Sequence, residues 1–397
     1  MTNDIASSRP SQLSLTALFL KFLRFGFLAF GGPVAQIAMI RQALVEEERW
    51  IAPARFNRLL AVLQILPGPE AHELCVHLGM VARGRLGGLL AGLGFMLPGL
   101  ALMLLTGWLY VTWIAHDAAL SSVLLGVQIV VLAIILRAVV RIGQHIVEDW
   151  LLAVVAAASL LATMAGVPFW IPLAAGGLVY AFSNRPWIAA VIVALALGAA
   201  VSARLFVAPD APIAIATGAP VTWAALFIAG LKGGLLTFGG AYTAIPYVRA
   251  DTVGRGWIGD ATFLDGIALA GVLPAPLVIF ATFVGYVAGG LGGALAITAG
   301  MFLPAFAFSL VLFERLEAVV ENPALHRILA GVAAAVVGII AATFVQLGEA
   351  TGARVSHWLV GTILFLSALA IVWRVKGAWV TPAVVAGGAI VGWLILP

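Results

Sequence analysis

The sequence predicts an all-α integral membrane protein with about 10–13 transmembrane segments. Of its 397 residues, 63% are hydrophobic and only 10% are charged, and the mean hydropathy is +1.12. A soluble domain carries roughly 25% charged residues. The apolar runs are roughly 15–25 residues long, which suits helices that cross a bilayer, whereas a membrane β-barrel would show short alternating segments.

The apolar segments form two series, separated by a polar break that contains Pro209, Asp210 and Pro212. The first series comprises residues 14–40, 57–82, 86–114, 120–143, 150–165, 167–182 and 187–203. The second comprises residues 222–248, 263–288, 291–312, 324–347, 358–374 and 377–396. We therefore divide the chain into a polar N-terminal tail (1–14), a first repeat (15–205), a linker (206–221) and a second repeat (222–397).

Matched motifs indicate that the second series is a copy of the first. Phe30-Gly31-Gly32 recurs 208 residues later, Leu66-Pro67-Gly68-Pro69 recurs 207 residues later as Leu-Pro-Ala-Pro, and Leu97-Pro98 recurs 206 residues later. Glycines and prolines cost stability in a membrane helix, so we interpret them as functional. The alternative is a gene fusion in a passive scaffold. Duplicated halves are typical of transporters, whose substrate binds near the midplane where the repeats meet.

The two Pro-x-Pro motifs predict broken helices. Proline lacks an N–H donor and clashes with a preceding helical turn, but it suits the first turn of a new helix. The prolines concerned are Pro67, Pro69, Pro274 and Pro276. The freed amides would line a cavity and attract an anion; they belong to Gly68, Glu70, Ala71, His72, Ala275, Leu277 and Val278. Two simple proline kinks are the alternative.

The paired glycines of the Phe-Gly-Gly motifs permit unwinding or close backbone approach. We place Gly31, Gly32, Gly239 and Gly240 in the predicted substrate-binding site. Pro33 follows the first pair directly, whereas the next proline of the second copy comes later, so we expect a milder second break. Small-residue helix packing is the alternative.

Two cations lie inside apolar runs at matched positions. Arg24 lies six residues before the first Phe-Gly-Gly and Lys232 six residues before the second. A cation in a membrane helix costs a few kcal/mol, so it should face a cavity or a partner. We predict that both attract an oxyanion; anchoring at the membrane interface is the alternative. Arg41 and Arg249 are weaker candidates.

Four titratable residues within apolar segments are predicted proton-coupling groups: Glu70, His72, Glu73 and Asp265. The two repeats differ at these positions, because Glu70 is matched by Leu277 and Asp265 by Arg58. The alternative is that the acidic residues face an aqueous vestibule and pair with Arg83 or Arg85.

Other chemistries find little support. Residues 72–77, HELCVH, approach a zinc-protease motif, but histidines five residues apart are separated by about 140° around a helix. One cysteine, Cys75, provides too few thiolates for a cysteine-built metal site, and neither a Walker loop nor a serine elbow occurs. The net charge of +4 is spread over short loops, which argues against nucleic acid. We predict no enzyme activity, no catalytic residues, no metal and no cofactor.

Together, these motifs resemble the chromate ion transporter family. The matching stretches are FGGPVAQIAMIRQALVEEERWIAPARF, LPGPEAHELCVHLGM and GGLLAGLGFMLPG in the first half, and LKGGLLTFGGAYTAIPYVR and FLDGIALAGVLPAPLVIFATFVGY in the second. They cover essentially the whole chain and look like the long-chain, two-domain members. The resemblance implies export of chromate, and hence chromate resistance, driven by the membrane potential or the proton gradient. Ala275 departs from the second Pro-Gly-Pro and should relax a strained turn there.

Five core segments per half fit this family and the repeated motifs, so we expect the repeats to be inverted. The resemblance places the protein as a multi-pass protein of the inner (cytoplasmic) membrane of a prokaryote. Its expected partners are chromate or a related oxyanion and the lipid bilayer, and a homodimer is compatible with the sequence. Sulfate shares the shape and charge of chromate, so a transporter of another oxyanion is the alternative; an intramembrane enzyme or a gated channel is a further one.

Overall fold

The computed structural model describes residues 13–65, 67–206, 220–238, 240–311, 323–375, 377 and 379–395. Within these ranges the protein consists of helices without strands. The first half contains α1 (Leu15–Phe27), α2 (Gly32–Arg41), η1 (Gln42–Glu47), α3 (Pro53–Ile65), α4 (Glu70–Thr112), η2 (Ile114–His116), α5 (Ala118–Ile146), α6 (Trp150–Met164), α7 (Trp170–Ala181) and α8 (Pro186–Phe206).

In the part of the second half that the structure describes, the main helices follow the same order, and no helix there corresponds to α8. It contains α9 (Trp223–Leu235), η3 (Ala241–Ala244), α10 (Ile245–Thr252), α11 (Asp260–Val272), η4 (Leu277–Ile279), α12 (Phe280–Val311), α14 (Pro323–Gly352), α15 (Trp358–Arg374) and α16 (Val380–Ile395). The predicted all-α class is confirmed.

The surface of the described chain is that of a membrane protein. Four helices are long and apolar enough to span a bilayer, and they lie at residues 70–112, 120–146, 277–311 and 326–352. Six further apolar helices are shorter than that. Exposed tryptophans lie at or next to helix ends, where an aromatic belt meets the headgroups; they include Trp113, Trp150, Trp170, Trp187, Trp223, Trp358 and Trp393.

Both α4 and α12 are sharply bent at equivalent places. The bend lies at Arg83 and Gly84 in α4, with φ −143° then +64°, and at Gly289 and Gly290 in α12, with φ −143° then +63°. Each bend brings its two arms together: a Cβ on Gly79 would lie 2.5 Å from the Gly87 carbonyl oxygen. Each helix is therefore a hairpin of two arms, as the separate apolar segments 57–82 and 86–114 indicate.

Helix pairs within each half pack through matched glycines. A Cβ on Gly26 of α1 would lie 2.5 Å from the Phe95 carbonyl oxygen of α4. At the matched position, a Cβ on Gly234 of α9 would lie 2.3 Å from the Met301 carbonyl oxygen of α12. These backbones approach so closely because the side chains are absent, and the duplication therefore extends to tertiary packing.

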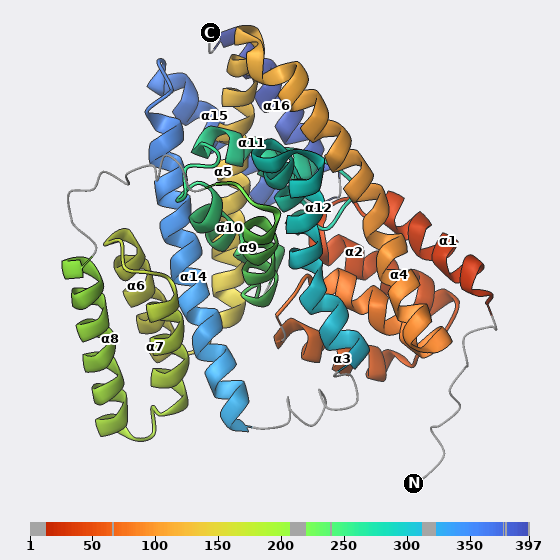
Figure 1. The fold of residues 1–397 in the computed structure, drawn as a ribbon, viewed down its shortest axis with the longest axis horizontal. Coiled ribbons are helices and arrows are strands. Elements are labelled where there is room, and N and C mark those ends of the chain that lie inside the picture. Colours follow the sequence, from red (N-terminus) through yellow and green to blue (C-terminus); the bar gives the residue numbers. More distant parts are fainter. Residues whose placement is uncertain are drawn as a thin grey trace.

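The C-terminal helices of each half pack against the long helix of the other half. Helices α6 and α7 contact α14, whereas α15 and α16 contact α5. In Figure 1, α5 descends through the molecule and α14 ascends beside it, so the two repeats have opposite orientations. The repeats are inverted and interlocked.

The two repeats adopt different arrangements around the central helices α5 and α14. In the second repeat, α10 packs against α14, and α11 packs against both α5 and α14. The corresponding helices of the first repeat, α2 and α3, pack mainly against α4 and lie to one side of the molecule (Figure 1). The inverted pair is therefore structurally asymmetric.

Candidate functional site

The first Pro-Gly-Pro breaks the chain between α3 and α4. Helix α3 ends at Ile65, Pro69 is the N-cap of α4, and α4 begins at Glu70. Gly68 has φ +146°, and a Cβ there would lie only 2.3 Å from Glu73 Oε1. Only glycine suits this position, and the predicted broken helix is present.

The second Pro-x-Pro has a different local structure. Pro276 precedes the short helix η4, and Ala275 is not among the described residues with positive φ. Ala275 is buried, and its methyl group occupies the space left by Gly99: a Cβ on Gly99 would lie 2.3 Å from Ala275 Cβ. The turn is relaxed, as the sequence predicts, and a glycine in the other repeat accommodates the alanine.

The Phe-Gly-Gly motifs also interrupt helices. Helix α1 ends at Phe27 and α2 begins at Gly32. Gly31 and Gly32, at the start of α2, have φ +83° and +78°. In the second copy α9 ends at Leu235, Gly240 has φ +130°, and only a 3₁₀ turn precedes α10. The second break is therefore not milder, because Pro246 lies in the first turn of a new helix rather than extending the old one. Gly239 lies outside the described residues.

Hydrogen bonds join the helix breaks of one repeat to those of the other. The Gly68 amide donates to the Thr237 carbonyl at 2.9 Å, directly before the second Phe-Gly-Gly. The other contact between the repeats uses a side chain. Gln36 Nε2 donates to the Ala29 carbonyl of its own repeat at 2.8 Å and to the Ala275 carbonyl of the second repeat at 2.9 Å. Ala29 and Thr237 are matched positions of the two repeats. We call these hydrogen bonds the inter-repeat clasp. Because η3 and η4, which follow the two breaks of the second repeat, also contact each other, all four breaks lie in one region.

Sequence reasoning missed Gln36, although an amide in an apolar helix is a recognisable signal. It is buried, and its matched position in the second repeat is Ala244. The Gln36 side chain therefore links the first Phe-Gly-Gly break to the second Pro-x-Pro, whereas the Gly68 backbone links the first Pro-Gly-Pro to the second Phe-Gly-Gly break directly.

The clasp also changes which amides are free. The Gly68 amide is bonded to Thr237, and the His72 amide donates to the Pro69 carbonyl at 2.9 Å. The amides of Glu70 and Ala71 have no partner among the described residues. The predicted set of four free donors is thus reduced to two in this conformation, because the break is packed against the other repeat.

Three of the predicted proton-coupling groups lie together in the first turn of α4. Glu70, His72 and Glu73 are all buried. Neither ring nitrogen of His72 and neither carboxyl oxygen of Glu73 has a hydrogen-bond partner among the described residues. The exposed side chains of Arg83 and Arg85 form no ion pair with them, so the vestibule alternative does not describe this arrangement.

The His72 ring lies at the contact between the two repeats. Its centroid is 4.9 Å from that of Phe302 and 4.7 Å from that of Phe306, both in α12. At the matched positions of the second repeat, Leu277, Ile279 and Phe280 replace Glu70, His72 and Glu73. The titratable cluster therefore occurs in one repeat only.

Asp265, on α11, lies in a separate polar network. Its carboxyl group accepts hydrogen bonds from the Tyr110 hydroxyl and from Gln128 Nε2, each at 2.8 Å. Gln128 Oε1 accepts in turn from Arg354 Nη1 at 2.9 Å. The network links α4, α5, α11 and the end of α14, and the structure does not bring Asp265 into the α4 cluster.

The two predicted cations have different surroundings. Arg24 is exposed and forms no ion pair or hydrogen bond with a described side chain. Lys232 pairs with Asp251 at 3.1 Å, and Asp251 also pairs with Arg255. Since Lys232 already has an acidic partner, an anion there would compete with Asp251.

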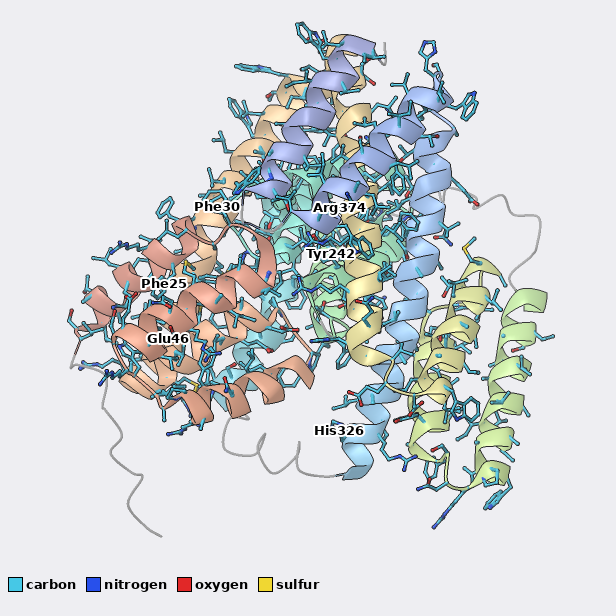
Figure 2. The ribbon with its side chains drawn as sticks, turned by 180° about the vertical axis from the view of Figure 1, so that it is seen from behind. Phe25, Phe30, Glu46, Tyr242, His326 and Arg374 are labelled. Atoms are coloured by element: carbon cyan, nitrogen blue, oxygen red, sulfur yellow. The ribbon has the colours of Figure 1, made fainter. Side chains whose placement is uncertain are left out.

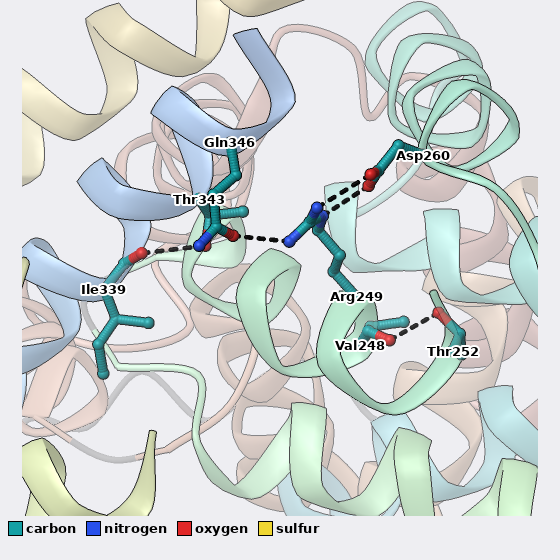
Figure 3. Close-up of polar contacts among 7 residues, drawn as sticks. All are labelled: Val248, Arg249, Thr252, Asp260, Ile339, Thr343 and Gln346. Carbon is teal, nitrogen blue, oxygen red and sulfur yellow. Dashed lines mark hydrogen bonds and ion pairs between the residues drawn. The ribbon is translucent and has the colours of Figure 1, made fainter. Parts of the chain in front are cut away.

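Of the two weaker candidates, Arg249 forms contacts that hold helices together. Figure 3 shows its guanidinium between Asp260 and Gln346, with Nε–Oδ1 and Nη2–Oδ2 distances of 2.6 and 3.0 Å to the carboxylate. This bidentate pair anchors α10 to the start of α11 and to α14. Arg41 forms an exposed ion pair with Glu46.

Inverted repeats with broken helices that meet across the repeat interface define a polytopic membrane protein with the architecture of secondary transporters. The chromate transporter family model matches residues 16–181 and 224–393, and the chain belongs to that family. No solved structure matches the chain.

Similar proteins extend over the full length. The chain is 54% identical to a chromate transport protein of Pseudomonas aeruginosa, covering 100% of this chain and 96% of the relative. It is 31% identical to a chromate transport protein of Cupriavidus metallidurans, covering 97% and 94%. It is 29% identical to a probable chromate transport protein of Synechococcus elongatus, covering 96% and 95%.

Proposed function

We propose that this protein exports chromate across the inner (cytoplasmic) membrane, driven by the membrane potential or the proton gradient, and so confers chromate resistance. One observation carries the proposal: in a member of the chromate transporter family, the inter-repeat clasp gathers the helix breaks of both repeats in one place. The names of the full-length relatives support chromate as the substrate.

The clasp region offers backbone donors to an oxyanion. The N-terminal turn of α4 presents the amides of Glu70 and Ala71, and glycine at the Phe-Gly-Gly breaks allows the backbone to approach a ligand. We propose that the substrate binds among the breaks, at Gly31, Gly32, Gly68, Glu70, Ala71, Gly239, Gly240, Ala275 and Leu277. Repeats with the boundaries 15–205 and 222–397 would each supply half of this site.

An inside-negative membrane potential favours expulsion of a dianion. Each elementary charge gains about 2.3 kcal/mol per 100 mV, so chromate gains about twice that, and export needs no ATP. Proton coupling would use Glu70, His72 and Glu73, with Asp265 as a second group. Because the α4 cluster has no titratable counterpart at the matched positions of the second repeat, we infer that the first repeat alone supplies this cluster.

The different arrangements of the two repeats support alternating access. The second repeat is docked on both α5 and α14, whereas α2 and α3 of the first pack mainly against α4, and α3 makes only a small contact with α14. Exchange of these two arrangements between inverted repeats would move the opening from one side of the membrane to the other.

Uptake of radiolabelled chromate into everted membrane vesicles tests the proposal. At an imposed inside-positive potential or pH gradient, vesicles with the protein should accumulate chromate saturably and resist excess sulfate. Accumulation of sulfate in place of chromate would contradict the substrate, and uptake without saturation would contradict a transporter mechanism.

Alanine substitution of the two predicted cations should weaken this uptake. We expect Arg24→Ala and Lys232→Ala each to lower chromate uptake several-fold without loss of membrane insertion, because each removes a charge that attracts the dianion. Lys232→Arg, which keeps the charge and the pairing with Asp251, is the matched control. Unchanged uptake in both alanine variants would remove these cations from the anion path.

A further inference from the structure

Arg137 is a cation close to the centre of the apolar helix α5. Residues 120–146 of this helix are long and apolar enough to span a bilayer. At 1.5 Å per residue, Arg137 lies about 6 Å from its middle, well inside a hydrocarbon core of about 30 Å. In this helix the offset between the repeats is 205, as Gly126 and Gly331 show, so its matched position in the second repeat is Ala342, which is fully buried. The charge is therefore particular to one repeat.

The guanidinium of Arg137 has no acidic partner among the described residues. It forms neither an ion pair nor a hydrogen bond there, and the charged or titratable groups that act on it are Arg141 and Tyr242. Arg141 lies one turn further along α5, and like charges at this spacing repel. A half-buried cation without a counterion is costly in a membrane. An anion bound near Arg137 and Arg141 would lower this cost.

The surroundings of Arg137 belong to the helix breaks of the second repeat. Tyr242 lies two residues after the second Phe-Gly-Gly and packs, partly buried, against the hydrophobic core (Figure 2). A Cβ on Gly240 would lie 4.0 Å from Ile142 of α5. The arm of α5 that carries Arg137 therefore runs beside the second break.

A small pocket opens at this place. Its lining includes Ile134 of α5, one turn before Arg137, together with Tyr242, Leu277 next to the second Pro-x-Pro, and Thr381 of α16. The lining is almost entirely apolar, and Tyr242 and Thr381 are the lining residues that carry a hydroxyl group. Arg137 itself does not line this pocket, which has room for little more than a water in this conformation. An oxyanion would therefore enter here only as the second break opens, with Arg137 one turn away from the lining.

From this geometry we infer that Arg137 binds the transported oxyanion at the second helix break, with Tyr242 as a hydrogen-bond donor. A guanidinium presents two parallel N–H groups that match two oxygens of a tetrahedral oxyanion. This inference deepens the proposed function and rests on it. It places a positive charge from α5 of the first repeat near the second break, where Leu277, Ile279 and Phe280 carry no charge.

Chromate uptake by everted vesicles carrying Arg137→Ala, Arg137→Lys or Arg374→Ala tests the inference. Arg137→Ala should raise the KM for chromate by about tenfold or more, since a charged hydrogen bond is lost. Arg137→Lys keeps the charge without the planar fork and should give an intermediate KM. Arg374→Ala removes an exposed cation at the end of α15 and should leave the KM unchanged.

The outcomes separate this inference from the proposed function. If wild-type vesicles accumulate chromate and Arg137→Ala does so with an unchanged KM, the inference is wrong and the proposed function stands. If wild-type vesicles accumulate none, both are wrong. If Arg137→Ala fails to insert, Arg137→Lys decides: a raised KM at normal insertion supports the inference, and a wild-type KM overturns it.

Discussion

Substitution of Gly99 with alanine should destabilise the protein and abolish most of its transport. The new methyl group would lie 2.3 Å from Ala275 Cβ, at the contact between the α4 hairpin and the second Pro-x-Pro. Extra methyl groups in a packed interior typically cost roughly 1–3 kcal/mol. We expect a lower unfolding temperature in detergent and at least a tenfold loss of chromate uptake, because the second break would be pushed out of the clasp.

The exchange Gly99→Ala with Ala275→Gly should recover most of both properties. It moves one methyl group from the second repeat to the first, and the nearest remaining neighbour of the new Cβ would be the Cα atom of residue 275, at 3.2 Å. Gly198→Ala is the control, since a Cβ there would meet no atom within 4 Å. A neutral Gly99→Ala, or a double variant no better than the single one, would contradict this packing. The double-mutant cycle measures the coupling directly.

Neutralising the α4 cluster should remove the effect of pH on transport. Glu70→Gln and Glu73→Gln keep the shape of each side chain but cannot exchange a proton. We expect the uptake driven by a pH gradient to fall about tenfold or more, while the uptake driven by the membrane potential persists. Initial rates in everted vesicles, measured between pH 6 and 8 as roughly the physiological range, check this.

Glu349→Gln is the matched control for these carboxylates, because Glu349 is an exposed carboxylate of α14. It should leave the pH profile unchanged. An identical pH profile in the wild type and in both cluster variants would remove Glu70 and Glu73 from the coupling mechanism. A change in Glu349→Gln of the same size would show that surface charge, rather than the cluster, sets the pH dependence.

Much of the fold could be predicted because the repeated motifs are local. Proline and glycine act on their own backbone, so Pro69 at the start of α4 and the break after Phe27 follow from the sequence. The bend at Gly84 lies between two segments that hydropathy separates. The inverted arrangement agrees with the expected number of core segments per half.

The contacts between the repeats could not be predicted in the same way. Gln36 and Ala275 are 239 residues apart, and motif spacing within a repeat says nothing about which break of the other repeat lies opposite. The ion pair of Lys232 with Asp251 crosses a helix break, so helical periodicity does not indicate it. The role of Gly99 could not be predicted, because the sequence does not show that Gly99 lies against Ala275 and leaves room for its methyl group.

Amide hydrogen exchange with and without chromate tests the central claim most directly. If one substrate site is built from the breaks of both repeats, chromate should slow the exchange of Gly68, Glu70 and Ala71 and also of Ala275 and Leu277. The four flanking prolines carry no amide, so the signal comes from these donors. Protection in both repeats is the predicted result; protection in one repeat only, or only in segments away from the clasp, would contradict a shared site.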